Sequence, residues 1–146
     1  EQYKMNGKRN LDMKSISKLK KELDKYFSLY IRLRNATPQG IAQCFTCGKI
    51  DHYKKLQCGH FQSRRHHATR WNEQNCEVQC VKCNMFEQGE QWKFGLKLDS
   101  KHGIGTSQEL EQLARQTVKK TRVDYEEDIR YYKAIVKNLK EEKGIE

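Results

Sequence analysis

The sequence has few apolar residues and no long apolar run. Hydrophobic residues make up 36% of its 146 residues, against 33% for charged residues. No stretch approaches the roughly 18 apolar residues that a membrane-spanning helix needs, so we expect no membrane partner. A chain of this length is most often one domain, but its apolar content is small for offsetting the conformational entropy lost on folding. A bound metal or a partner chain would supply further stability.

The residues from Glu1 to Asn10 are polar and basic and lack the apolar segment of a secretory signal peptide. Six cysteines are present, and four of them form two Cys-x-x-Cys pairs. This spacing is typical of metal-binding knuckles in a reducing compartment rather than of a disulfide framework. We therefore expect a cytoplasmic protein.

Acidic residues are in the minority. The 19 Asp and Glu residues are outnumbered by 29 Lys and Arg residues, which gives a formal net charge of +10. A basic excess of this size favours a polyanionic partner, most often nucleic acid. It also serves solubility, so the charge alone leaves both interpretations open.

Helical periodicity precedes the cysteine-rich segment. We expect a flexible polar lead-in over residues 1–12 and an amphipathic helix over residues 13–36, in which apolar residues recur at spacings of mostly three and four. Ser15 or Ser17 is suited to cap its start. The only proline, Pro38, marks its end. The other face of the helix is basic, which suits solvent, a phosphate backbone or a second copy of the chain.

Further helices are predicted after the cysteines. We place Trp92 in the core of the segment 41–102, and two C-terminal helices over residues 106–142 with a break near residues 118–121. Each C-terminal helix begins with the pattern of a capping box, in which a hydroxyl residue is followed three positions later by an acid. The two patterns are Thr106 with Glu109 and Thr121 with Asp124.

The two Cys-x-x-Cys pairs predict a structural zinc ion. Four thiolates in a tetrahedral arrangement close the coordination sphere of zinc and leave no position for water. The four cysteines are Cys44, Cys47, Cys80 and Cys83. Cys58 and Cys76 belong to no close pair, and we interpret both as packing residues.

A zinc ion closed by four thiolates cannot activate water, so a hydrolase would need a second ion. Phosphodiester cleavage requires a nucleophilic water, a base and a cation beside the phosphate. His60 suits the base because the pKa of imidazole is near neutral. Asn75 follows 15 residues later, and Asn84 directly follows the last knuckle cysteine. The amide oxygen of Asn84 is a plausible ligand for magnesium or manganese.

This order of residues resembles the HNH, or His-Me finger, nucleases. The resemblance implies an α+β fold with a zinc-clamped ββα core over residues 41–102, flanked by long N- and C-terminal α-helices. It makes His60 the general base and gives Asn84 the metal-ligand position. It leaves Asn75 two roles, either holding the His60 imidazole or bracing the adjacent loop.

Longer segments resemble the NinG (Rap) recombination proteins of lambdoid and related phages. They are Phe27 to Arg34, then Cys58-Gly59-His60-Phe61, then Ala68 to Trp71, and finally Gln79-Cys80-Val81-Lys82-Cys83-Asn84. This resemblance implies a structure-specific endonuclease that cuts branched recombination intermediates such as Holliday junctions and D-loops. It also implies a host bacterial cytoplasm as the site of action if the chain is phage- or prophage-encoded.

One position departs from the nuclease pattern. Many HNH nucleases place a metal-binding Asp or His directly before the base, where this chain has Gly59. The second protein ligand therefore stays open between Gln57, a backbone carbonyl, and His66 or His67.

Basic residues lie on both sides of His60. Arginine suits bidentate binding of phosphate, so we expect DNA contacts from these positions, with a solvated loop as the alternative. The residues are Lys54, Lys55, Arg64, Arg65 and Arg70.

The sequence thus predicts a magnesium-dependent endonuclease that acts on branched DNA. A non-catalytic zinc-stabilised nucleic-acid-binding module is the alternative, and a zinc-stabilised protein adaptor is a third class. A two-fold branched substrate is matched by a two-fold dimer, so we expect a homodimer formed through the long outer helices.

Overall fold

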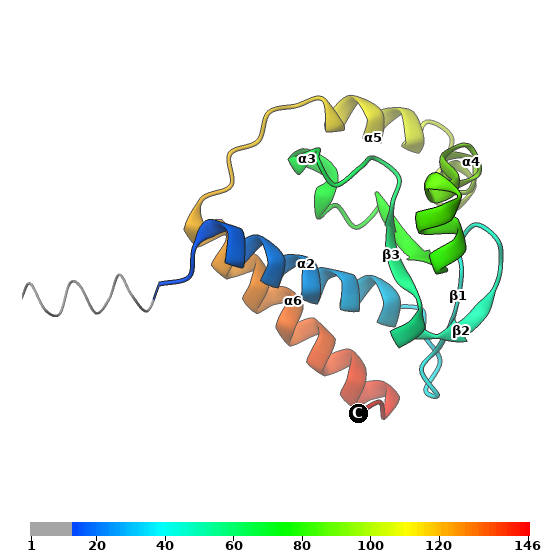
Figure 1. Cartoon of the computed structure of the whole chain (residues 1–146), viewed down its shortest axis with the longest axis horizontal. Coiled ribbons are helices and arrows are strands. Elements are labelled where there is room, and N and C mark those ends of the chain that lie inside the picture. Colours follow the sequence, from blue (N-terminus) through cyan, green and yellow to red (C-terminus); the bar gives the residue numbers. More distant parts are fainter. Residues whose placement is uncertain (1–12) are drawn as a thin grey trace, which may run out of the picture.

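Two long helices pack side by side beneath the cysteine-rich segment (Figure 1). The computed structural model describes residues 13–146, and the expected lead-in over residues 1–12 lies outside this range. Helix α2 spans Ile16–Leu33, and the Ser15 side chain caps it by accepting from the Lys18 N–H. Helix α6 spans Arg122–Lys143 and begins with the capping box of Thr121 and Asp124 that its sequence predicts.

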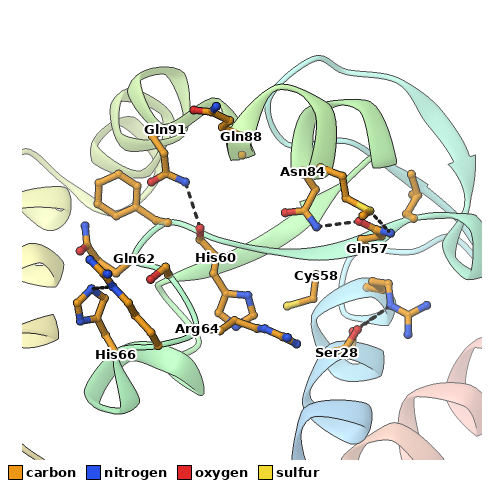
Figure 2. Close-up of a pocket in the computed structure, with 17 residues that line it drawn as sticks. Ser28, Gln57, Cys58, His60, Gln62, Arg64, His66, Asn84, Gln88 and Gln91 are labelled. Carbon is orange, nitrogen blue, oxygen red and sulfur yellow. Dashed lines mark hydrogen bonds between the residues drawn. The ribbon is translucent and has the colours of Figure 1, made fainter. Parts of the chain in front are cut away.

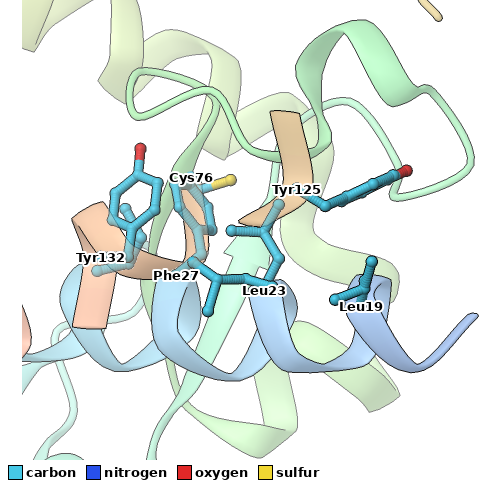
Figure 3. Packing of buried hydrophobic residues seen from close by; sticks show 8 residues of the cluster. Leu19, Leu23, Phe27, Cys76, Tyr125 and Tyr132 are labelled. Carbon is cyan, nitrogen blue, oxygen red and sulfur yellow. The ribbon is translucent and has the colours of Figure 1, made fainter. Parts of the chain in front are cut away.

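The apolar stripes of these helices face each other and form the largest core cluster (Figure 3). Helix α2 contributes Leu19, Leu23, Phe27 and Ile31, and α6 contributes Tyr125, Ile129 and Tyr132. The rings of Phe27 and Tyr132 meet edge to face, with centroids 5.1 Å apart. Since each helix buries its apolar stripe against the other, the outer surface left for a second copy of the chain is mainly polar.

Two separate antiparallel strand pairs follow α2 in the chain. Strand β1 (Ile41–Gln43) pairs with β2 (Ile50–His52), and the short helix η1 (Tyr53–Lys55) follows. Strand β3 (Gln57–His60) pairs with β4 (Cys76–Gln79). Within the described chain β3 pairs with β4 alone, so its other edge is open. The prediction of a mixed α+β fold is confirmed at this level.

The long connection between β3 and β4 carries helix α3 (His67–Arg70). Two short helical segments follow β4, namely η2 (Lys82–Phe86), a π-helix, and η3 (Gln88–Glu90), a 3₁₀ helix. Helices α4 (Gln91–His102) and α5 (Thr106–Ala114) complete the part of the chain before α6. Gly89 breaks the helical path with a φ of 80°.

The prediction of a buried Trp92 is wrong, because its side chain is 82% exposed. Helix α4 begins only after the break at Gly89, at Gln91, and this register turns Phe94 and Leu98 inward. These two residues pack with Leu110 of α5.

The predicted capping box of Thr106 is also wrong. Gly105, with a φ of 99°, is the N-cap residue of α5, and the Asp99 carboxylate of α4 accepts from the Ser107 N–H in the first turn at 2.8 Å. Thr106 is already its first residue, and its hydroxyl donates to the Gly103 carbonyl at 2.7 Å. Among residues 13–146, no helix combines the length and the apolar character needed to cross a bilayer.

Candidate functional site

The four knuckle cysteines converge as predicted. Cys44 and Cys47 lie in the turn after β1, and Cys80 and Cys83 follow β4. Their four sulfur atoms lie within 4.8 Å of one another, and the Sγ atoms of Cys47 and Cys80 are 3.6 Å apart. A tetrahedral zinc ion with Zn–S distances of about 2.3 Å requires sulfur atoms about 3.8 Å apart. The cluster could therefore hold a zinc ion, and it ties the β1–β2 pair to the end of β4.

Backbone N–H groups surround these sulfur atoms. The Lys49 N–H points at Cys47 Sγ at 3.4 Å, and the Cys83 N–H points at Cys80 Sγ at 3.5 Å. Burial alone would raise the pKa of the Cys44 thiol, but backbone N–H groups and the Thr46 hydroxyl lower this pKa to about 6. Such donors favour the thiolate form at Cys44, whereas burial and the neighbouring cysteines raise the pKa of Cys83 to about 12.

A groove of about 1030 Å³ runs along the open edge of β3. Its walls come from α2, β3, the loop over residues 61–66 and the segment from Asn84 to Gln91 (Figure 2). Arg32, Arg64 and Arg65 line it, and among the described lining residues there is no Asp or Glu. The groove is therefore suited to an anionic ligand such as a phosphate backbone.

His60 lies in this groove at the end of β3. Its Nε2 is 2.9 Å from the Arg70 carbonyl oxygen. A carbonyl can only accept, so Nε2 carries the proton and the lone pair of the neutral ring is at Nδ1. Burial lowers the pKa of His60 below 6.5, and the nearby charge of Arg64 lowers this pKa further, although the bond to Arg70 acts in the opposite direction. At neutral pH the ring is uncharged and able to accept a proton.

Asn75 braces the loop between β3 and β4. Its side chain is fully buried, and its Oδ1 accepts from the Gln62 N–H at 2.8 Å. Its Nδ2 donates to the carbonyls of Gln62 and Thr69, each at 3.0 Å. The sequence left two roles open for Asn75, and these bonds match the bracing role.

Asp24 of α2 holds the other side of this loop. Its carboxylate accepts from Arg70 Nε at 3.1 Å, from Arg70 Nη2 at 2.5 Å and from Trp71 Nε1 at 2.9 Å. Arg70 is thereby fixed, and its carbonyl in turn fixes the His60 ring. Sequence reasoning missed Asp24, which lies with Glu22 among the lysines of this helix.

Asn84 lies on the opposite side of β3 from His60 (Figure 2). Its backbone N–H donates to the Cys80 carbonyl at 3.0 Å, so the second knuckle fixes its position. Its Nδ2 donates to Gln57 Oε1 at 2.8 Å. Both residues line the groove, but because they lie on opposite sides of β3 the structure does not bring the side chains of the two expected partners, His60 and Asn84, into contact.

The space beside Gly59 is occupied by Gln79. A Cβ atom on residue 59 would lie 2.0 Å from Gln79 Oε1 and 2.8 Å from Gln79 Cγ. Gln79 is fully buried, and its Nε2 donates to Thr46 Oγ1 and to the Gly89 carbonyl. A metal-binding side chain directly before His60 is therefore sterically excluded by a side chain that links the zinc knuckle to the turn at Gly89.

Some of the other residues predicted to bind DNA or metal line the groove, and others do not. Arg64 and Arg65 are exposed and line the groove, and so does His66. His67 packs against Trp71 with ring centroids 5.6 Å apart. The exposed residues Lys54 and Lys55 lie on η1 and do not line the groove.

Taken together, these features define a small α+β protein in which a four-cysteine cluster that could hold zinc stands beside a basic groove. A family model described as bacteriophage lambda NinG protein matches residues 1–142, and the chain belongs to this NinG family. The comparison with curated proteins and the comparison with solved structures returned no match.

Proposed function

We propose that the protein is a metal-dependent, structure-specific DNA endonuclease of the HNH type, which cuts branched recombination intermediates as Rap-type proteins do. The observation that carries this proposal is the state of His60. Its Nε2 is 2.9 Å from the Arg70 carbonyl oxygen, burial lowers its pKa, and it lies in a groove that arginines line and that has no Asp or Glu among the described lining residues.

In the proposed reaction His60 takes a proton from water at Nδ1. The resulting imidazolium keeps its Nε2–H bond to the Arg70 carbonyl, while Asp24 lies just behind Arg70. Arg64 and Arg65 bind the phosphates on either side of the scissile bond, because their side chains are exposed in the groove. The Arg64 guanidinium is 4.0 Å from the Asp24 carboxylate, a partly exposed ion pair that a DNA phosphate would replace.

A magnesium or manganese ion would neutralise charge on the scissile phosphate when bound. The protein donors that fit it are two amide oxygens, those of Asn84 and Gln57. Magnesium is commonly bound by one or two carboxylates together with substrate phosphates. With no carboxylate among the described lining residues, this ion would depend strongly on the DNA phosphate, and its affinity for the free protein would be low.

The proposed ββα core consists of β3, β4 and the helical segment that starts after Cys80. The four-cysteine cluster supports this assignment because it joins the end of β4 to the turn that carries Asn84. The zinc ion then has a structural role.

The test is cleavage of four-way junction, D-loop, duplex and single-stranded DNA with magnesium, with manganese or with EDTA. We expect metal-dependent cleavage of branched DNA, and its loss in His60→Ala. Binding without cleavage under every metal condition would refute the enzyme and would support the non-catalytic nucleic-acid-binding alternative. Cleavage that survives His60→Ala would refute the choice of base.

We also propose a homodimer on the two-fold branched substrate. Because α2 and α6 bury their apolar stripes against each other, this dimer would use the polar outer faces of these helices. Sedimentation velocity with and without a four-way junction measures the stoichiometry, and a single chain per junction would refute the dimer.

A further inference from the structure

Cys58, His60 and Cys76 form a second group of potential metal ligands. Side chains two residues apart on a strand point to the same face, which places Cys58 and His60 together on β3. Cys76 is the direct cross-strand partner of His60 on β4. One ligand atom from each of the three residues lies within 4.8 Å of the others.

This group differs from the four-cysteine cluster in its access to solvent. Cys58 and His60 line the groove, whereas Cys76 is fully buried against α2 (Figures 2 and 3). Three protein ligands with an open side toward solvent are the arrangement of exchangeable or catalytic zinc sites, not of closed structural ones.

We propose that Cys58, His60 and Cys76 bind a soft divalent cation, Zn²⁺, at a second site separate from the four-cysteine cluster. Zinc binds cysteine sulfur at about 2.3 Å and imidazole nitrogen at about 2.0 Å, so the three side chains need to close by at most about 1 Å. Binding releases one proton from each thiol, and two thiolates with one Zn²⁺ leave the site neutral.

Two further features favour this site. The Nε2–H of His60 donates to the Arg70 carbonyl at 2.9 Å, and a hydrogen bond of this kind orients a metal-binding histidine and fixes its tautomer. Arg34 donates to the Cys76 carbonyl at 2.7 Å, which places a positive charge beside the deeper thiol. Burial and the neighbouring Cys58 raise the pKa of Cys76, and the charge of Arg34 opposes this shift, so the bound cation itself must displace the proton of the buried thiol.

The site has a regulatory consequence, which rests on the proposed function of His60 as base. A bound Zn²⁺ takes the ring lone pair that deprotonation of water requires. Magnesium, a hard cation that prefers oxygen, does not compete for two sulfur ligands. Excess zinc therefore switches the nuclease off while magnesium leaves His60 free.

Metal counting tests the site without any need for nuclease activity. The full chain is saturated with Zn²⁺, passed over a desalting column, and its zinc measured by inductively coupled plasma mass spectrometry. We expect two zinc ions per chain, and one in Cys58→Ala and in Cys76→Ala. Ser28→Ala, which alters the same groove without removing a ligand, is the matched control and keeps two. One ion in the unchanged protein, or two in both cysteine variants, would overturn the site.

Cobalt and activity measurements complete the test. Both proteins are loaded with one equivalent of zinc before Co²⁺ is added. The unchanged chain is expected to show thiolate-to-cobalt absorption from the second site, and Cys58→Ala is expected to lose it, while circular dichroism confirms that the variant is folded. In cleavage assays with magnesium, Zn²⁺ is expected to inhibit the unchanged protein at least tenfold more strongly than Cys58→Ala. Equal inhibition would overturn the regulatory role. If the unchanged protein takes up two zinc ions in the counting assay but, without added Zn²⁺, cuts no DNA with magnesium, the nuclease proposal is refuted and the metal site stands.

Discussion

Replacement of Asp24 by Asn tests whether α2 positions His60, the proposed general base, through Arg70. The carboxylate accepts three hydrogen bonds, two from Arg70 and one from the Trp71 indole. Loss of a hydrogen bond to a charged group costs about 1.5–3 kcal/mol. The Asp24 and Arg70 side chains are 21% and 17% exposed, so solvent screens part of this interaction. We expect the free energy of unfolding to fall by about 2–3 kcal/mol in total.

The same substitution is expected to slow cleavage. Asp24 fixes Arg70, and the Arg70 carbonyl holds Nε2 of His60. A displacement of about 1 Å at a catalytic group can reduce a rate by about 100-fold. We therefore expect a 10- to 100-fold lower kcat on branched DNA, with a much smaller change in KM, because Arg64 and Arg65 still line the groove.

Urea unfolding followed by circular dichroism measures the first effect, and single-turnover cleavage of a four-way junction measures the second. Glu22→Gln is the matched control on the same helix, since it removes only an ion pair with Lys14, whose side chain is 56% exposed. Asp24→Glu is expected to restore part of both quantities. Full cleavage in a destabilised Asp24→Asn protein would refute the positioning of His60 through Arg70.

Three further predictions concern zinc, pH and Gly59. Removal of zinc with a strong chelator should abolish cooperative thermal unfolding of the β-strand region, because structural zinc contributes on the order of 10 kcal/mol to such domains. An unchanged melting curve would refute the four-cysteine clamp. Because burial lowers the pKa of His60 from its ordinary value of 6.5, the ring stays neutral to lower pH, and kcat/KM should fall only below pH 6.5. A pH–rate profile whose midpoint lies above pH 6.5 would refute a buried neutral base. Gly59→Ala should destabilise the fold by about 1–3 kcal/mol in urea unfolding, because the added Cβ overlaps Gln79; wild-type stability would show that Gln79 can move away.

Features that depend on neighbouring residues in the chain could be predicted from the sequence. The apolar stripes of α2 and α6 follow helical spacing, and the capping box of Thr121 spans only three residues. The convergence of the four knuckle cysteines was predictable because the Cys-x-x-Cys spacing is itself a metal-binding geometry. The mixed α+β class followed from the same patterns.

Local sequence patterns gave wrong predictions where more than one helix start or register fits the same residues and tertiary packing determines which one forms. Thr106 and Glu109 have capping-box spacing, but the positive φ of Gly105 starts α5 one residue earlier than a Thr106 cap would require. Trp92 has the composition of a core residue, but the break at Gly89 sets a helix register that buries Phe94 and Leu98 instead.

The sequence by itself determined the candidate zinc ligands, the class of fold and the position of His60 between basic residues, because each is encoded by spacing within a short segment. Only the tertiary structure decided what surrounds His60. Asp24 reaches Arg70 from a helix far away in the chain, Gln79 fills the space beside Gly59 from the neighbouring strand, and Cys76 lies opposite His60 through strand register. These contacts join residues far apart in sequence, and the packing of β3 and β4 against α2 is what brings them together.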